Sequence, residues 1–156
     1  MSTDNFDLKL LNALQDDGRL TNQELAERVG LSASQCSRRR TALEKDGLIE
    51  GYCARLSSEK LGLELVVFVE ISLAIHSRGN AQQFVNVLEN MEEVQEAYSL
   101  TGEADYLVKL IVPNLKRLSE ILNSIFLPHE GVAKLHSSIV LDRLKQTPKL
   151  PLAHLR

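Results

Sequence analysis

Basic side chains are concentrated in one short stretch of this 156-residue sequence. The charged residues of positions 28–45 are Arg28, Arg38, Arg39, Arg40, Lys45 and a single acid, Glu44. Five cations against one acid give this stretch a charge of +4, and the chain total of −3 then leaves −7 for the remaining residues. A cluster of basic residues in an otherwise acidic chain indicates a surface for nucleic acid, because lysine and arginine pair with backbone phosphates.

The centre of this stretch is predicted to be a helix with one polar face. At about 100° per residue, Ala33, Cys36 and Leu43 fall on the side that is expected to face a core. The residues expected to contact DNA are Ser32, Ser34, Gln35, Ser37, Arg38, Arg39, Thr41 and Lys45. Arginine can bridge guanine or clamp phosphate, glutamine can pair with adenine, and serine can do either. A solvated basic face on a small helical bundle is the alternative interpretation.

Two similar helix starts lie 11 residues apart, at Thr21 and Ser32. Each is followed three residues later by a partner for a capping box, Glu24 and Gln35. An earlier helix is expected to end at Asp17-Gly18. The residues expected to be buried in the first two helices are Phe6, Leu10, Leu11, Leu14, Leu25, Ala26 and Val29. A tight turn between two short helices predicts a helix-turn-helix.

After residue 47 the pattern changes from helices to strands. Residues 48–56 predict a strand-like connector, and the alternation of apolar residues from Val67 to Ile75 predicts a strand. The later elements are expected to be a helix around 81–88, strands at 94–100 and 106–112, a helix around 118–125 and a strand at 132–141. This β-α-β-β-α-β order is ferredoxin-like.

The predicted fold class is therefore α+β, with a winged-helix-like helix-turn-helix domain followed by a ferredoxin-like domain. The expected boundaries are a DNA-binding domain at 1–50, a connector at 51–63, the ferredoxin-like domain at 64–144 and a tail at 145–156. The tail contains Pro148 and Pro151 and is expected to be an extended arm.

Little in the sequence indicates catalysis, a cofactor or a metal site. The histidines without ligand-like spacing are His76, His129, His136 and His154. There is no phosphate loop or dinucleotide fingerprint. Cys36 and Cys53 form no CxxC pair, and we interpret them as small buried side chains rather than a disulfide or metal site. No apolar run approaches the roughly 20 residues of a membrane span, so no membrane contact and a cytoplasmic location are expected.

Several motifs in the order found here resemble the Lrp/AsnC (feast/famine) family of bacterial and archaeal regulators. The matching stretches are Asp7-Leu8-Lys9-Leu10-Leu11, Asp17-Gly18-Arg19, Glu24 to Ser32, the helix from Cys36 to Leu43, Asp46-Gly47-Leu48-Ile49, Lys60-Leu61-Gly62 and Gly102 to Tyr106. The resemblance covers nearly the whole chain. It implies a nucleoid-associated regulator whose second domain senses an amino acid and dimerises through its sheet. It also implies that the dimers assemble into octamers or similar discs that wrap DNA.

One position departs from the family pattern. The recognition helix of the family usually carries Val or Ile after two arginines, whereas this chain has Arg40 there. Arg40 is expected either to lay its stem on the core with its guanidinium at the edge, or to reach a phosphate.

The effector, a free amino acid, is expected to bind where the turn from Gly102 to Tyr106 meets a neighbouring subunit. Gly102 permits a positive φ, so backbone N–H groups there can approach a carboxylate. Asp105 can accept a bond from an ammonium group. Leu100, Tyr106 and Ser137 are the other residues assigned to this site. A plain hairpin turn with a surface acid is the alternative.

An obligate dimer is also expected, because Val66, Phe68 and Ala74 leave the second face of the first strand partly apolar. We therefore predict a sequence-specific transcriptional regulator, not an enzyme, whose activity or assembly responds to an amino acid. The alternatives are a regulatory subunit of a metabolic enzyme and an architectural DNA-binding protein without an effector.

Overall fold

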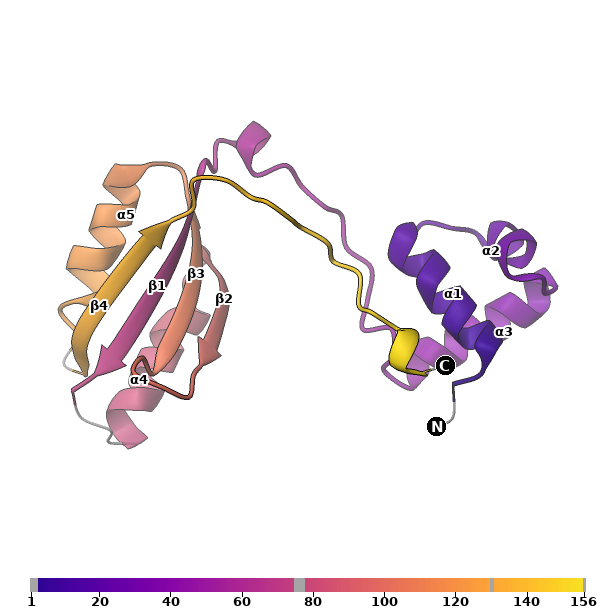
Figure 1. Ribbon diagram of the computed structural model, residues 1–156, viewed down its shortest axis with the longest axis horizontal. Helices are drawn as coiled ribbons and strands as arrows, with labels where there is room; N and C mark the ends of the chain where they lie inside the picture. Colours follow the sequence, from indigo (N-terminus) through magenta and orange to yellow (C-terminus); the bar gives the residue numbers. More distant parts are fainter. Residues whose placement is uncertain (1–2, 75–77, 130, 156) are drawn as a thin grey trace. The chain divides into compact units, whose positions relative to one another are not determined.

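A computed structural model describes residues 3–74, 78–129 and 131–155 of the chain. The chain folds into two compact units (Figure 1). The N-terminal unit comprises Met1–Arg55 together with Lys145–Arg156, and the sheet unit comprises Leu56–Leu144. The C-terminal tail is therefore part of the first unit.

Three helices form the N-terminal unit: α1 (Asn5–Asp16), α2 (Asn22–Val29) and α3 (Ala33–Lys45). Both expected capping boxes are present, since Thr21 and Ser32 each accept from the backbone N–H three residues on. Their partner side chains accept from the backbone N–H of the capping residue in return. A third box, between Asp4 and Asp7 at the start of α1, was not expected. These caps satisfy backbone donors that a helix start leaves free.

The core of the N-terminal unit confirms most of the expected buried residues. Its fully or nearly buried members are Leu10, Leu11, Ala13, Leu14, Leu20, Leu25, Ala26, Val29, Cys36 and Leu43. The expectation for Phe6 is wrong, because its side chain is 38% exposed. Its ring lies in the first turn of α1, and the cationic groups of Lys9 and Arg39 lie 5.5 and 5.7 Å from the ring centroid.

Residues 48–56 do not form the expected strand. Within the described part of the N-terminal unit there is no strand with which they could pair. A strand needs a neighbour to satisfy its backbone groups, and Leu56 is 76% exposed. The sheet unit then begins at Leu56 and contains a short 3₁₀ turn, Glu59–Leu61, ahead of its first strand.

The C-terminal tail returns to α1 instead of ending as a free arm. The Leu150 N–H donates to Oε1 of Gln15 at 2.6 Å, and the Gln15 side-chain amide donates back to the Leu150 carbonyl at 3.4 Å. Lys149 forms an ion pair with Asp16. Leu152 packs against the core of the unit, ahead of a last 3₁₀ turn at Ala153–Leu155.

The sheet unit has the expected β-α-β-β-α-β order. Its elements are β1 (Leu65–Leu73), α4 (Arg78–Glu89), β2 (Val94–Ser99), β3 (Tyr106–Val112), α5 (Leu115–Ile121), a π-helical turn (Leu122–Phe126) and β4 (Val132–Ile139). The sheet is antiparallel throughout, with strand order β2-β3-β1-β4. The ferredoxin-like prediction is confirmed. Ile75, the expected end of β1, and His76 lie outside the described residues.

Period-two alternation in β1 separates a covered face of the sheet from an open one. Val67, Val69 and Ile71 are fully buried against side chains of the helices such as Phe84 and Phe126. The intervening residue Phe68 points to the open face and is 37% exposed.

Candidate DNA-binding and ligand-binding sites

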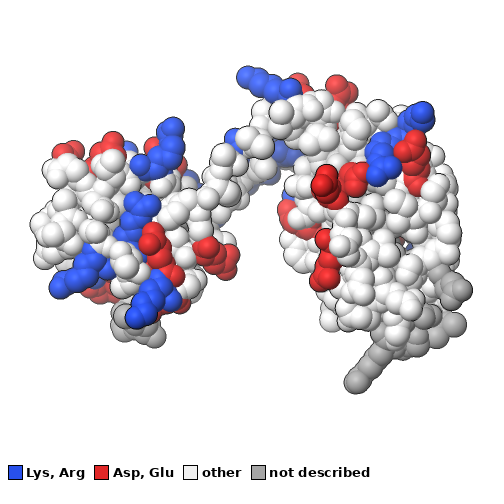
Figure 2. All heavy atoms as spheres, turned by 180° about the vertical axis from the view of Figure 1, so that it is seen from behind, with Lys and Arg blue, Asp and Glu red and all other residues white. Residues whose placement is uncertain are grey.

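Helix α3 exposes the polar row that the sequence predicted for DNA. The exposed members are Ser32, Ser34, Gln35, Ser37, Arg38, Thr41 and Lys45. Cys36 and Leu43 hold the opposite side in the core, at 0% and 5% exposure. Blue lysine and arginine side chains lie over the surface of this unit in Figure 2. The row therefore presents hydrogen-bonding groups and cations on one helix, as a major groove requires.

Four of the predicted DNA contacts, Ser32, Ser34, Gln35 and Arg39, have partners inside the protein. The Gln35 Oε1 atom accepts from the Ser32 backbone N–H and hydroxyl, both at 3.0 Å, so this oxygen serves the capping box. The guanidinium of Arg39 forms ion pairs with Asp7 at 2.7 Å and Asp4 at 2.8 Å. These carboxylates raise the pKa of Arg39 further above its ordinary value, with the bond to Asp7 the largest cause. Arg39 thus ties the recognition helix to the start of α1.

Arg40 occupies a junction between three segments of the unit. Its Nη1 donates to the carbonyl of Leu20 at 3.1 Å, and its Nε lies 3.1 Å from Glu44 and 2.9 Å from the Tyr52 hydroxyl. The guanidinium carbon lies 4.7 Å from the centroid of the Tyr52 ring. The Arg40 side chain is 23% exposed, and its charged end lies among these partners. The guanidinium is thus held within the protein, and its expected contact with a phosphate stays a prediction.

The prediction that both cysteines are buried is confirmed for Cys36 only. Cys36 is fully buried in the helical core, and burial raises the pKa of its thiol. Cys53 is exposed, which the sequence did not indicate. Both are free thiols.

The Gly102 turn contains the positive φ that the sequence predicted. Gly102 has φ +143°, which a residue with a side chain rarely adopts. Asp105 lies next to the end of β1, where its Oδ2 accepts from the backbone N–H of Leu73 at 2.7 Å. Its own N–H donates to the Ile71 carbonyl, and its carbonyl accepts from the Leu100 N–H, each at 2.9 Å. These bonds fix the direction of the carboxylate.

Four of the five predicted effector residues lie together, and one does not. Leu100, Gly102, Asp105 and Tyr106 all belong to the β2–β3 hairpin. Ser137 lies on β4, opposite Val69 in the register, at the other edge of the sheet. One chain therefore cannot bring Ser137 to the hairpin turn.

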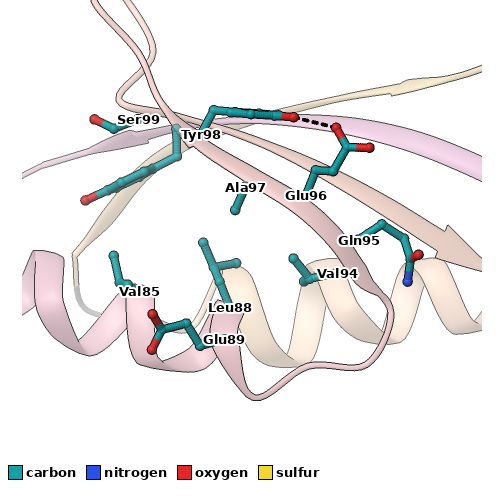
Figure 3. Close-up of a pocket in the computed structure, with 10 residues that line it drawn as sticks. Val85, Leu88, Glu89, Val94, Gln95, Glu96, Ala97, Tyr98 and Ser99 are labelled. Atoms are coloured by element: carbon teal, nitrogen blue, oxygen red, sulfur yellow. Dashed lines mark hydrogen bonds between the residues drawn. The ribbon is translucent and has the colours of Figure 1, made fainter. Parts of the chain in front are cut away.

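A cavity of about 370 Å³ between α4 and β2 was not predicted from the sequence. Val85 and Leu88 project from α4 toward Ala97 of β2 (Figure 3). Tyr98 bonds to Glu96 on the strand. Ser99 and Tyr106, the residues that flank the hairpin turn, also line the cavity. The sequence contains only a weak indication of this cavity, because the apolar residues of α4 predict packing in the core as readily as a cavity wall.

Comparison with known proteins agrees with this arrangement. Residues 3–50 match the model of a winged helix-turn-helix DNA-binding domain, and residues 66–150 match that of the Lrp/AsnC ligand-binding domain. The chain belongs to the Lrp/AsnC family. It is a DNA-binding transcriptional regulator with a ligand-binding domain.

Relatives and solved structures match over almost the full length of this regulator. The leucine-responsive regulatory proteins of Klebsiella pneumoniae and Escherichia coli K12 are each 38% identical over 147 residues, covering 94% of this chain and 90% of theirs. A transcriptional regulator from Neisseria meningitidis, solved in complex with L-Met, has a TM-score of 0.95 and 39% identity, covering 99% of both chains. An AsnC family regulator from Agrobacterium tumefaciens has a TM-score of 0.91 and 32% identity, covering 97% of this chain and 99% of its own.

Two further properties concern the described residues alone. Among them, no three His, Cys, Asp or Glu side chains are grouped as metal ligands would be. None of the helices they form has the length and apolar character needed to cross a membrane.

Proposed function

We propose that this regulator reads DNA sequence through α3 and that an amino acid controls its DNA binding or assembly. The observation that carries the first half is the exposed polar row of α3, which contains Arg38, Thr41 and Lys45. Base contacts specify a sequence while phosphate contacts fix position, and this row offers groups for both. Arg39 can reach DNA only by leaving its carboxylate partners, so Arg38 is the principal candidate for base contact.

An Arg38→Ala variant tests the DNA site, with Arg55→Ala, at an exposed arginine outside the basic stretch, as a matched control. If Arg38 contacts a base, binding to a selected duplex should weaken by about 1–3 kcal/mol, with specificity relaxed at one position. If it holds only phosphate, the loss should be equal on all sequences and the salt dependence should decrease. Unchanged affinity in a gel-shift titration removes Arg38 from the interface.

The effector is proposed to bind at the Gly102 turn, with its ammonium group at Asp105 and its carboxylate at backbone N–H groups. The solved L-Met complex of the related Neisseria meningitidis regulator supports an amino acid. The adjoining cavity, with Val85 and Leu88 on its wall, favours a ligand with an apolar side chain. Ser137 takes part in this site only if a neighbouring subunit supplies it.

Calorimetry with the twenty amino acids on wild type and Asp105→Asn tests the effector site. Asparagine removes the charge but keeps an oxygen that can accept from the Leu73 N–H, so the turn should keep its shape. We expect at least a tenfold loss of affinity, since a charge-assisted bond contributes about 1.5–3 kcal/mol. Glu59→Gln, a change at an exposed acid outside the turn, should have little effect. Equal binding to wild type and Asp105→Asn excludes Asp105 as the ammonium partner.

The protein is further proposed to form a homodimer through the open face of the sheet, and dimers to assemble into an octamer or similar particle. Phe68 on this face is 37% exposed, and its cross-strand neighbour Lys109 pairs with Glu96. Apolar surface of this kind is unfavourable in water. Light scattering that shows a monomer at micromolar concentration contradicts the proposal and the two-fold half-site geometry that follows from it.

A further inference from the structure

Tyr52 links the residues after α3 to the turn between α1 and α2. It follows α3 by seven residues and precedes the sheet unit, which begins at Leu56, by four. Its ring lies so close to Gly18 that a Cβ there would be 2.9 Å from Cδ1 of the ring. A side chain at position 18 would therefore force the Tyr52 ring or the turn to shift.

The hydroxyl of Tyr52 completes a hydrogen-bonded cluster on α3. It donates to Glu44 Oε1 at 2.9 Å and accepts from Arg40 Nε at 2.9 Å. Burial raises the pKa of this hydroxyl, and the bond to Glu44 adds to the effect. The other end of the Arg40 guanidinium reaches the Leu20 carbonyl. Because the guanidinium is planar, holding its Nε on one side fixes the direction in which Nη1 points.

We infer that Tyr52 is a positioning residue for DNA reading: it holds Arg40 on the Leu20 carbonyl and so sets the orientation of α3 relative to the α1–α2 turn. The contact lies within the protein. The inference rests on the proposed function, in which α3 reads the DNA sequence. Neither Tyr52 nor Arg40 is proposed to touch DNA. Base contacts depend on helix orientation more strongly than phosphate contacts do, so loss of the cluster should reduce specificity before it reduces general DNA affinity.

The test uses full-length Tyr52→Phe, Arg40→Met and the double variant. Phenylalanine keeps the ring against Gly18 and removes only the hydroxyl, while methionine keeps an apolar stem and removes the guanidinium. Arg55→Met, a change at an exposed arginine of the same segment, controls for the loss of one positive charge. Each protein is titrated with the highest-affinity duplex that wild type selects from a random pool, and with a shuffled duplex of equal length, at several salt concentrations.

We expect Tyr52→Phe to bind the selected duplex about two- to tenfold more weakly, the range that the loss of a hydrogen bond allows. Arg40→Met should lose at least as much, because it also removes the bonds to Leu20 and Glu44. Binding to the shuffled duplex and the salt dependence should stay as in wild type. The double variant should be no weaker than Arg40→Met, because both changes break the same cluster. Equal losses on both duplexes, additive losses, or a salt slope reduced by about one in Arg40→Met, as for a phosphate ligand, would each overturn the inference.

Hydrogen exchange read by mass spectrometry separates this inference from the proposed function. Tyr52→Phe should speed exchange in peptides from the 17–21 turn and from α3, while peptides from α4 should exchange as in wild type. If wild type enriches no duplex, sequence-specific binding fails as a function, whereas the exchange data still decide whether Tyr52 holds α3. Unchanged exchange in both N-terminal segments overturns the inference whatever the DNA result.

Discussion

Replacing Gly18 with alanine should change stability in opposite directions, depending on whether Tyr52 is present. Gly18 is not among the glycines with positive φ, so its backbone suits alanine. Alanine alone should therefore stabilise the fold by about 0.4–1 kcal/mol, because it restricts the unfolded chain. In wild type, however, the new Cβ would lie 2.9 Å from Cδ1 and 3.6 Å from Cε1 of the Tyr52 ring.

The clash sets the expected magnitude in the wild-type background. Extra methyl groups in a packed site cost about 1–3 kcal/mol, and the gain from the unfolded state offsets part of this. A net loss of about 1–2 kcal/mol is expected for Gly18→Ala. In a Tyr52→Ala background the ring is absent, and the same change should stabilise by about 0.4–1 kcal/mol.

Four full-length proteins make the measurement: wild type, Gly18→Ala, Tyr52→Ala and the double variant. Urea unfolding followed by circular dichroism gives the free energies, and exchange of the peptide covering α1 assigns the effect to the N-terminal unit. The coupling between the two changes should be about 1–3 kcal/mol. If Gly18→Ala has the same sign and size in both backgrounds, the ring does not constrain residue 18 and the argument fails.

Two further predictions concern the tail and the sheet unit. Leu152→Ala should destabilise the N-terminal unit by about 1–2 kcal/mol, less than a fully buried leucine costs, because Leu152 is only partly buried in its core. Leu150→Ala, at a 71% exposed side chain, should change the free energy of unfolding by no more than about 0.5 kcal/mol. Equal effects of the two changes on hydrogen exchange in α1 would disprove docking of the tail. In the sheet unit, hydrogen bonding from Arg117 holds the pKa of Glu93 below its ordinary value of 4.5. A carboxyl whose pKa is lowered by folding stabilises above its unfolded pKa, so the unfolding free energy should fall by about 0.2–1 kcal/mol as pH drops below about 4.5. Glu93→Gln should remove that part of the pH dependence in urea melts, and an unchanged profile would show that the pair contributes nothing.

Local sequence patterns predicted most of the elements and their order. Capping boxes at Thr21 and Ser32 depend on side chains three residues apart, and both form as predicted. Period-two alternation placed Val67, Val69 and Ile71 on the buried face of a strand, because adjacent residues of a strand point to opposite faces. The exposed row of α3 followed from helical periodicity alone. Motif order then indicated the family.

Contacts between distant segments were decided only by the tertiary structure. Three contacts join residues that are far apart in the sequence. They are Arg40 with Tyr52, Leu150 with Gln15 and Arg39 with Asp7, which lie 12, 135 and 32 positions apart. No periodicity links such positions, because their meeting depends on how whole helices and the tail pack. The same reason explains the errors at residues 48–56, where apolar residues indicated a strand but no neighbouring strand exists among the described residues of that unit. Spacing along the chain fixes which groups share a face, whereas packing fixes which groups they meet.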